Sequence, residues 1–300
     1  MLATAAALEP WTLLLVLASA GLYACTLVAV GASLFRLALL DQPALDSGSG
    51  SRRTITGAAW LALALALLQA PLQAGFLAGG TLAGAVDPAL LAAVLGSAQG
   101  TRLALLLAGL LLLWYGASAK PRHLRLGQGS SLLGAALVVA AYTQVGHTVG
   151  TEPRWLLAAL LALHLSAVAF WVGALPPLYR LVGLPHVRAL TARTLVRFGH
   201  VASGVVAALV GAAAALAWLL MDGWPGWPPG PYAQAIAIKL ALLSLLLACA
   251  ACNRWWLVPA FERAEPGAAM RLRASIALEG LLVLCILLVT ALLTSTTPPR

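Results

Sequence analysis

Two histidines, His147 and His164, lie in or beside segments that are otherwise apolar enough to be immersed in lipid. Neutral imidazole is the commonest metal-ligating side chain and suits copper, iron and zinc. A polar side chain at membrane depth is costly, so its presence there indicates a functional site. The stretch from Gln144 to Pro177 contains both histidines, and it is where we first expect metal chemistry.

The two histidines are expected at different depths. His147 ends an apolar segment at the outer surface, and Thr143 and Gln144 precede it by four and three residues, which predicts one shared helical face. His164 follows in the next segment, about 15 Å below that surface at the rise of a helix. One shared ion and two successive stations are both open. Gln144 is a further candidate ligand.

Below His164 the sequence predicts the floor of this site. Trp171 is seven residues further on and shares the helical face of His164, where packing or a lid is a more common role than chemistry. Pro176 and Pro177 follow, and we expect the helix to break or kink there.

Several other polar residues are weaker candidates. Gln73 and Gln69 are four residues apart, and hydrogen bonding between helices explains such a pair better than metal binding. Cys249 and Cys252 have CxxC spacing, which places both sulfurs on one helical face, although small packing residues are the more common account. Glu279 is expected to pair with a cation such as Arg254.

Composition decides which elements must hold these residues. The chain has 300 residues, of which 62% are hydrophobic and 9% charged, whereas soluble domains carry about 25% charged residues. The sequence therefore predicts an all-α polytopic membrane helix bundle. The net charge of +9 is better explained by membrane topology and anionic lipid headgroups than by nucleic acid.

About 20 apolar residues are needed for one helical span, and the chain contains eight such runs. They are residues 10–36, 56–80, 97–118, 128–148, 153–180, 197–221, 233–256 and 273–295. The connections are short, so residues 1–300 are expected to form a single transmembrane domain. The Ser-Gly-Ser-Gly-Ser run at 47–51 is expected to be a flexible inner linker.

The distribution of basic residues orients the bundle. Fourteen of the eighteen lysines and arginines fall in the connections on one side of the predicted spans. By the positive-inside rule that side faces the cytoplasm, and both termini are then periplasmic.

Six pieces of the second half resemble the CopD/PcoD family of bacterial inner-membrane copper proteins. They are Gly-His at 146–147, the run 164–175 (HLSAVAFWVGAL), Arg-Phe at 197–198, the run 239–248 (KLALLSLLLA), Asn-Arg at 253–254 and the run 275–282 (SIALEGLL). They occur in the order and spacing of the family over about residues 140–295, while the first half matches mainly in hydropathy.

The resemblance implies copper as the ion, with His147 and His164 as the leading ligand candidates. It also implies supporting positions of unassigned role, which are Trp171, Lys239, Asn253, Arg254 and Glu279. Cys249 and Cys252 are not part of the family pattern. A separate periplasmic CopC-like copper-binding partner is expected, because no such domain is attached.

We therefore expect a copper permease of the bacterial inner membrane rather than an enzyme. Two rivals remain open: a b-type haem protein that passes electrons, and a non-transporting scaffold for a periplasmic copper protein. The direction of transport, the driving force and the oxidation state of copper are not set by the sequence. The small-residue motif from Gly75 to Gly79 is compatible with packing within one chain or in a homodimer.

Overall fold

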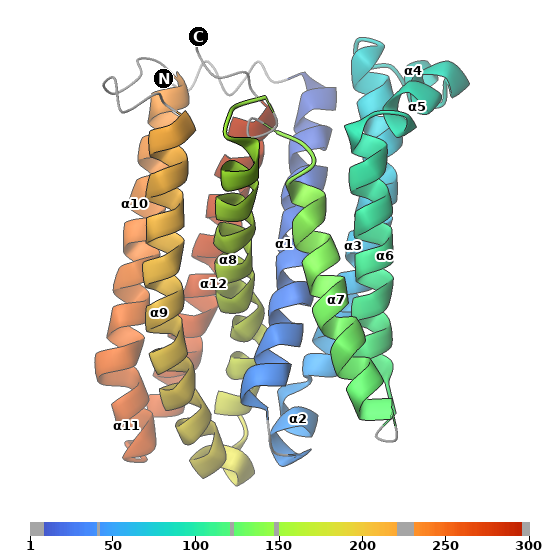
Figure 1. Cartoon of the computed structure of the whole chain (residues 1–300). Coiled ribbons are helices and arrows are strands. Elements are labelled where there is room, and N and C mark those ends of the chain that lie inside the picture. Colours follow the sequence, from blue (N-terminus) through green and yellow to red (C-terminus); the bar gives the residue numbers. More distant parts are fainter. Residues whose placement is uncertain (1–8, 41–42, 121–122, 147–149, 221–230, 296–300) are drawn as a thin grey trace.

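The computed structural model describes residues 9–40, 43–120, 123–146, 150–220 and 231–295, and these residues form helices and turns without any strand. Eight of the helices are long and apolar enough to cross a membrane. The predicted all-α membrane bundle is therefore confirmed. Both the first and the last spanning helix have their terminal ends at the same end of the bundle (Figure 1).

Consecutive spanning helices run in opposite directions (Figure 1). They are α1 (Pro10–Leu39), α3 (Ser51–Leu77), α6 (Ala98–Ser118), α7 (Leu124–Tyr142), α8 (Arg154–Val182), α9 (Arg188–Leu220), α10 (Pro231–Cys252) and α12 (Ala268–Ser295). Most of them pack against one another, but α9 and α10 make little backbone contact. Shorter elements join the spanning helices: α2 (Pro43–Ser49), α4 (Leu82–Ala85), α5 (Pro88–Leu95), η3 (Pro185–Val187), η4 (Asn253–Leu257) and α11 (Val258–Glu262).

Helix α1 is the centre of the bundle. It packs against α3, α6 and α7 on one side and against α8 and α12 on the other, so it joins an N-terminal half to a C-terminal half (Figure 1). The backbones of α1 and α8 touch where two glycines meet. A Cβ atom on Gly31 would lie 1.6 Å from the carbonyl oxygen of Ala169, and one on Gly173 would lie 2.2 Å from the nitrogen of Ala32. This contact fixes α8, which carries His164, against the centre of the bundle.

The inner connection between α1 and α3 is ordered rather than a flexible linker, which corrects the prediction for residues 47–51. Ser49 and Ser51 are fully buried, because Asp46 ties the segment together. Its carboxylate accepts hydrogen bonds from Arg36 (2.7 Å), Arg52 (3.2 Å) and Ser51 (3.1 Å). Burial alone would raise the pKa of Asp46, but the hydrogen bond from Arg36 and the charges of both arginines outweigh it and hold the pKa below 3.8.

The outer connection between α3 and α6 contains two short helices that the hydropathy pattern did not indicate. Thr81 caps α4 by accepting from the Gly84 nitrogen, and Asp87 caps α5 by accepting from the nitrogens of Ala89 and Leu90. The Asp87-Pro88 pair is a helix-start signal that is legible in the sequence. These helices lie over the outer end of α3 and α6 (Figure 1).

Near the candidate residues, the predicted end of one helix and the predicted break in another are wrong. Helix α7 ends at Tyr142, and residues 143–146 form a turn and bend, so Gln144 does not continue a helical face. Helix α8 runs through Pro176 and Pro177 to Val182 without a break. A proline removes one hydrogen bond and disturbs one carbonyl, and here tight packing with α1 holds the helix together.

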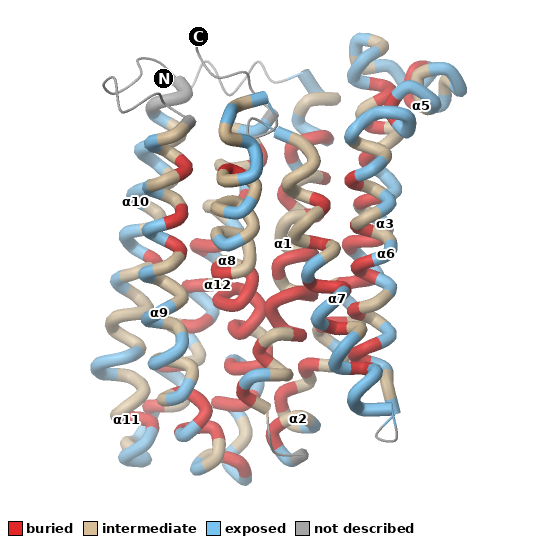
Figure 2. The backbone as a smooth tube through the Cα atoms, viewed as in Figure 1, coloured by how far each residue is buried: buried red, intermediate tan, exposed pale blue. Residues whose placement is uncertain are grey.

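Burial is concentrated where α1, α8 and α12 meet (Figure 2). In the most apolar window of α1, 50% of the residues are buried, against 11% in α9 and 6% along α10. The faces of α9 and α10 are therefore free to contact lipid or a molecule in the space between these two helices.

Candidate functional site

Three of the predicted supporting residues meet in one hydrogen-bonded cluster in the C-terminal half. The Glu279 carboxylate on α12 accepts from the Trp171 indole nitrogen on α8 (3.1 Å) and from the Asn253 amide nitrogen (2.5 Å). Glu279 is only 4% exposed and Trp171 6%. The side-chain amide oxygen of Asn253 is buried without a partner in the described part of the chain. The cluster therefore still has an unused hydrogen-bond acceptor.

Arg254, which follows in the chain, points elsewhere. Its guanidinium donates to the Gly199 carbonyl oxygen and to the Ser203 hydroxyl, both on α9. The predicted pairing of Glu279 with Arg254 is therefore wrong: polar but uncharged donors from α8 and η4 hold the carboxylate instead. Asn253 and Arg254 point in different directions, as adjacent residues on a helix do. They begin a π-helix that extends to Leu257, and such elements are frequent at functional sites.

These side chains line a cavity of about 600 Å³ between α8, α9, α10, η4 and α12. Trp171, Asn253 and Glu279 form part of its wall, Arg254 and Ser203 another part, and most of the rest is apolar. The cavity occupies the region where α9 and α10 are poorly buried. It is thus an amphipathic space that runs from the centre of the bundle toward the inner end.

His164 lies higher on α8, ten residues from the start of the helix and about 15 Å along it. Its imidazole lies near the backbone of Leu209 on α9. The Nδ1 atom is buried and has no partner among the described residues. A buried imidazole nitrogen without a hydrogen-bond partner is either energetically costly or a place for a ligand.

Lys239 on α10 is close enough to His164 for its charge to act on the imidazole. The lysine is half-buried. His164 on α8 and Lys239 on α10 thus lie near each other.

Of the remaining outer candidates, His147 and Gln144, the structure describes only Gln144. His147 falls outside the described residues. Gln144 donates to the Ala140 carbonyl oxygen and to the Thr143 hydroxyl, each at 3.2 Å, and these contacts are local to the end of α7.

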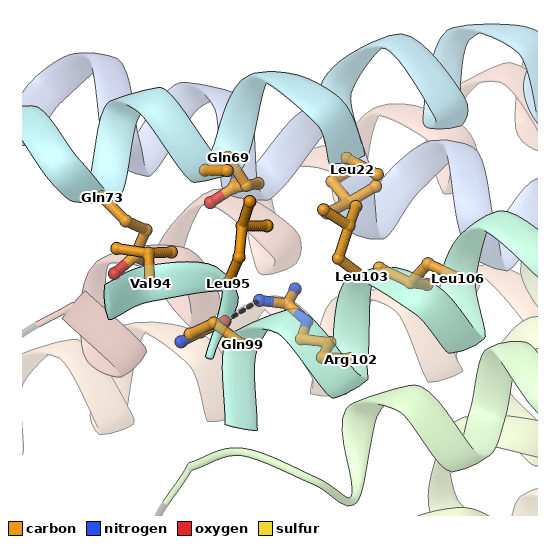
Figure 3. A pocket seen from close by; sticks show the side chains of 11 residues that line it. Leu22, Gln69, Gln73, Val94, Leu95, Gln99, Arg102, Leu103 and Leu106 are labelled. Atoms are coloured by element: carbon orange, nitrogen blue, oxygen red, sulfur yellow. Dashed lines mark hydrogen bonds between the residues drawn. The ribbon is translucent and has the colours of Figure 1, made fainter. Parts of the chain in front are cut away.

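The glutamines of α3, Gln69 and Gln73, lie at a different cavity, between α3 and α6. Gln69 donates to the Ser19 hydroxyl on α1 at 3.3 Å, as expected of a residue that joins helices. Gln69 and Gln73 line a small cavity with Gln99 and Arg102 of α6 (Figure 3). Arg102 is only 8% exposed, and its positive charge makes Gln73 an unfavourable ligand for a cation.

The two cysteines of α10 are partly buried free thiols. Cys249 interacts electrostatically with both Cys252 and Glu279, so the pair lies beside the Glu279 cluster. Within the described residues, no three His, Cys, Asp or Glu side chains gather as a ready-made metal site. The side chains that could bind an ion in this half are therefore separated from one another rather than gathered at one place.

Two contributors were not identified from the sequence. Ser203 holds Arg254, and Arg102 is a buried cation. No signal in the sequence indicated that Ser203 would contact Arg254, because this contact depends on how α9 lies against η4. The burial of Arg102 could not be predicted from the sequence. It depends on α5 and α7, and the hydropathy pattern did not predict where these helices end.

Family comparisons cover both halves of the chain. The model for copper resistance protein D matches residues 192–293, and the model for the copper resistance protein D-like N-terminal domain matches residues 7–154. No curated protein and no solved structure matched the chain. The first match includes Lys239, Asn253, Arg254 and Glu279.

Proposed function

Because this chain belongs to the copper resistance protein D family, we propose that it moves copper ions between the periplasm and the cytoplasm across the bacterial inner membrane. It is a multi-pass membrane protein of copper resistance. The transport step, its site residues and its periplasmic partner are what the proposal adds. Copper is the cargo of the protein in this proposal, not a resident cofactor.

The buried, unpartnered Nδ1 of His164 is the observation that carries the proposal. An imidazole nitrogen that is not engaged in a hydrogen bond is available as a metal ligand. His164 lies in the half of the bundle where α8, α9 and α10 surround it with few other polar groups. It is therefore the first station that we assign to an ion inside the membrane.

Lys239 gives this station a means of release. In the metal-free protein its ammonium group lies near His164, and a copper ion that enters must either displace this charge or tolerate it. Repulsion between the two cations weakens binding, which favours passage over storage. Lys239→Met is therefore expected to raise copper affinity about tenfold, or ~1.4 kcal/mol, and to slow release.

The Glu279 cluster is the second station in this proposal. It offers the Glu279 carboxylate and the unpartnered side-chain amide oxygen of Asn253. Cys249 lies close enough to interact electrostatically with Glu279. The Trp171 and Asn253 donors hold the carboxylate in place. The adjoining cavity leads from there toward the inner end of the bundle.

His147 and Gln144 remain our candidates for the entrance. A periplasmic CopC-like copper-binding protein is the partner that we expect to deliver copper there. Imidazole and oxygen ligands suit divalent copper, and an added thiolate suits monovalent copper. The order from Gln144 and His147 to Glu279 and Cys249 is thus compatible with either ion.

The test measures copper bound to the purified protein and copper moved into proteoliposomes. His164→Ala is expected to lower bound copper and to abolish transport. Glu279→Gln is expected to slow transport while the His164 station still binds. His186→Ala is the matched control, because His186 is an exposed imidazole on the short η3 helix. If His164→Ala and His186→Ala bind and transport copper equally well, the site assignment fails.

The haem alternative has less support from geometry. Two axial imidazoles must face each other at one level in a helix bundle. Leu209, the α9 residue at the level of His164, is nine residues from His200, or about 13 Å along the helix. A Soret band in the purified protein would nevertheless restore this alternative, and copper binding without transport would favour the scaffold.

A further inference from the structure

Arg102 is a buried cation in the outer half of the N-terminal helices, away from the proposed copper route. It follows Ala98, the first residue of α6, by one helical turn and is 8% exposed. Within the described residues, none of the ion pairs includes Arg102, and no carboxylate lies within 4.0 Å of it. A guanidinium in this position has lost much of its hydration and has no protein counter-charge, which is energetically unfavourable.

The partners that Arg102 does have are neutral and incomplete. One guanidinium nitrogen donates to the Gln99 side-chain oxygen at 3.4 Å, a long contact. The guanidinium also contacts the Tyr142 side chain, with its carbon 5.1 Å from the centre of the ring. The Nε atom is buried without a partner among the described residues. At least one strong donor therefore remains for something that the protein chain does not supply.

A small cavity lies beside this guanidinium. Its walls include the amide side chains of Gln69 and Gln73 from α3 and of Gln99 from α6, together with Arg102 itself (Figure 3). The space measures about 20 Å³, and a cavity of ~10–15 Å³ on this measure is enough for one water molecule. It is thus large enough for a single monatomic ion but too small for sulfate, phosphate or an organic carboxylate.

We propose that this cavity binds a small inorganic anion of the halide class, physiologically chloride, as the counter-ion of Arg102. The guanidinium supplies the positive charge and the unpartnered Nε donor, and the Gln73 amide that lines the cavity supplies a further N–H group. The sign of the charge excludes a metal cation, and the size excludes larger anions. This inference is independent of the copper proposal, because none of its residues lies on the route from His164 to Glu279.

Chloride at Arg102 has a structural consequence. The site connects α3 to α6 directly below the helices α4 and α5, and Val94 and Leu95 of α5 complete the cavity wall. Neutralising the arginine removes the penalty of the buried charge, so a bound halide stabilises the outer end of the N-terminal half. The folded state should therefore gain stability with chloride concentration in a saturable way.

The first experiment locates the ion. Crystals of the full-length protein grown in sodium bromide are measured at the bromine absorption edge. We expect one anomalous peak within hydrogen-bonding distance of the Arg102 guanidinium. A water molecule in that cavity with no anomalous signal would overturn the proposal.

The second experiment measures binding in detergent solution. The midpoint of thermal unfolding is followed while sodium chloride replaces sodium gluconate at constant ionic strength. The wild-type protein should show a saturable rise. Arg102→Met should lose it, and Gln73→Leu should weaken the apparent chloride affinity at least tenfold without removing the charge.

Arg154→Met is the matched control, because Arg154 is an outer but exposed arginine. It should keep the full chloride response. An equal response in Arg102→Met and wild type would refute the site. If Arg102→Met does not fold, Gln73→Leu and the bromide crystals still decide, since neither needs that variant.

Discussion

The hydrogen bond from Trp171 to Glu279 yields a quantitative test of the C-terminal cluster. Trp171→Phe removes the indole donor and keeps an aromatic ring, whereas Glu279→Met removes the acceptor and keeps the side-chain length. Each single change also alters packing, and a large-to-small change in a core typically costs about 1–3 kcal/mol or more. The two changes together form a double-mutant cycle in which these packing terms cancel.

The expected coupling energy follows from the type and place of the bond. Hydrogen bonds to charged groups contribute about 1.5–3 kcal/mol in soluble proteins, but interhelical bonds in membranes average about 0.6 kcal/mol and reach about 1.7. The membrane values apply here, because the helices remain in the micelle when they separate. The 3.1 Å distance and the 4% exposure of Glu279 place this bond in the upper part of the range. We expect about 1 kcal/mol.

The assay is reversible unfolding by sodium dodecyl sulfate in mixed micelles, followed by circular dichroism. Trp60→Phe combined with Glu279→Met is the control cycle, because Trp60 is 50% exposed and packs with Trp114 in the N-terminal half. That cycle should be additive within about 0.3–0.5 kcal/mol. If the Trp171 cycle is additive to the same degree, the bond does not stabilise the cluster and the reasoning is wrong.

Three further predictions concern the scaffold. Gly31→Ala places a methyl group against the Ala169 carbonyl and should destabilise the protein by about 1–3 kcal/mol, whereas Gly280→Ala meets open space and should be neutral or stabilising by up to about 1 kcal/mol; detergent unfolding compares them. Because the pKa of Asp46 is lowered, its stabilising contribution is complete well above pH 3.8 and is lost as the pH falls through its folded value; Asp46→Asn should abolish that pH dependence of unfolding. Asp87→Ala should destabilise α5 by about 1 kcal/mol, which amide hydrogen exchange in Ala89 and Leu90 would report.

The spanning helices could be predicted from the sequence because hydropathy over about 20 residues is a strong signal. The ends of the helices were harder to predict. The hydropathy pattern extended the fourth span to residue 148, although α7 ends at Tyr142, since apolar residues in a turn score like apolar residues in a helix. The Ser-Gly run after Asp46 has the composition of a flexible linker, but the ion pairs of Asp46 with Arg36 and Arg52 order it.

The candidate site was predictable as a set of residues but not as a set of contacts. Trp171, Asn253 and Glu279 are separated by up to 108 positions in the chain, and their meeting depends on how α8, α10 and α12 rotate about their axes. The expected partner of Glu279 was a nearby charge. The structure places the Trp171 and Asn253 donors there instead, while the Arg254 guanidinium contacts α9.

Buried charge distinguishes the two halves of the bundle as environments for a cation. Among the described residues, the charged side chains that are buried are Arg102 in the N-terminal half and Glu279 in the C-terminal half. At the low dielectric of a membrane interior, a charge of the same sign repels a copper ion and a charge of opposite sign attracts it over several ångströms. Gln73, which lies beside Arg102, is therefore a weaker copper ligand than the groups at Glu279. This holds although the side chains of Gln73 and Glu279 both carry oxygen atoms that suit copper. The buried charges thus favour the Glu279 cluster over Gln73 as a copper site, whereas Lys239 opposes copper at His164. Replacing Arg102 by a neutral residue should leave the copper affinity of His164 unchanged.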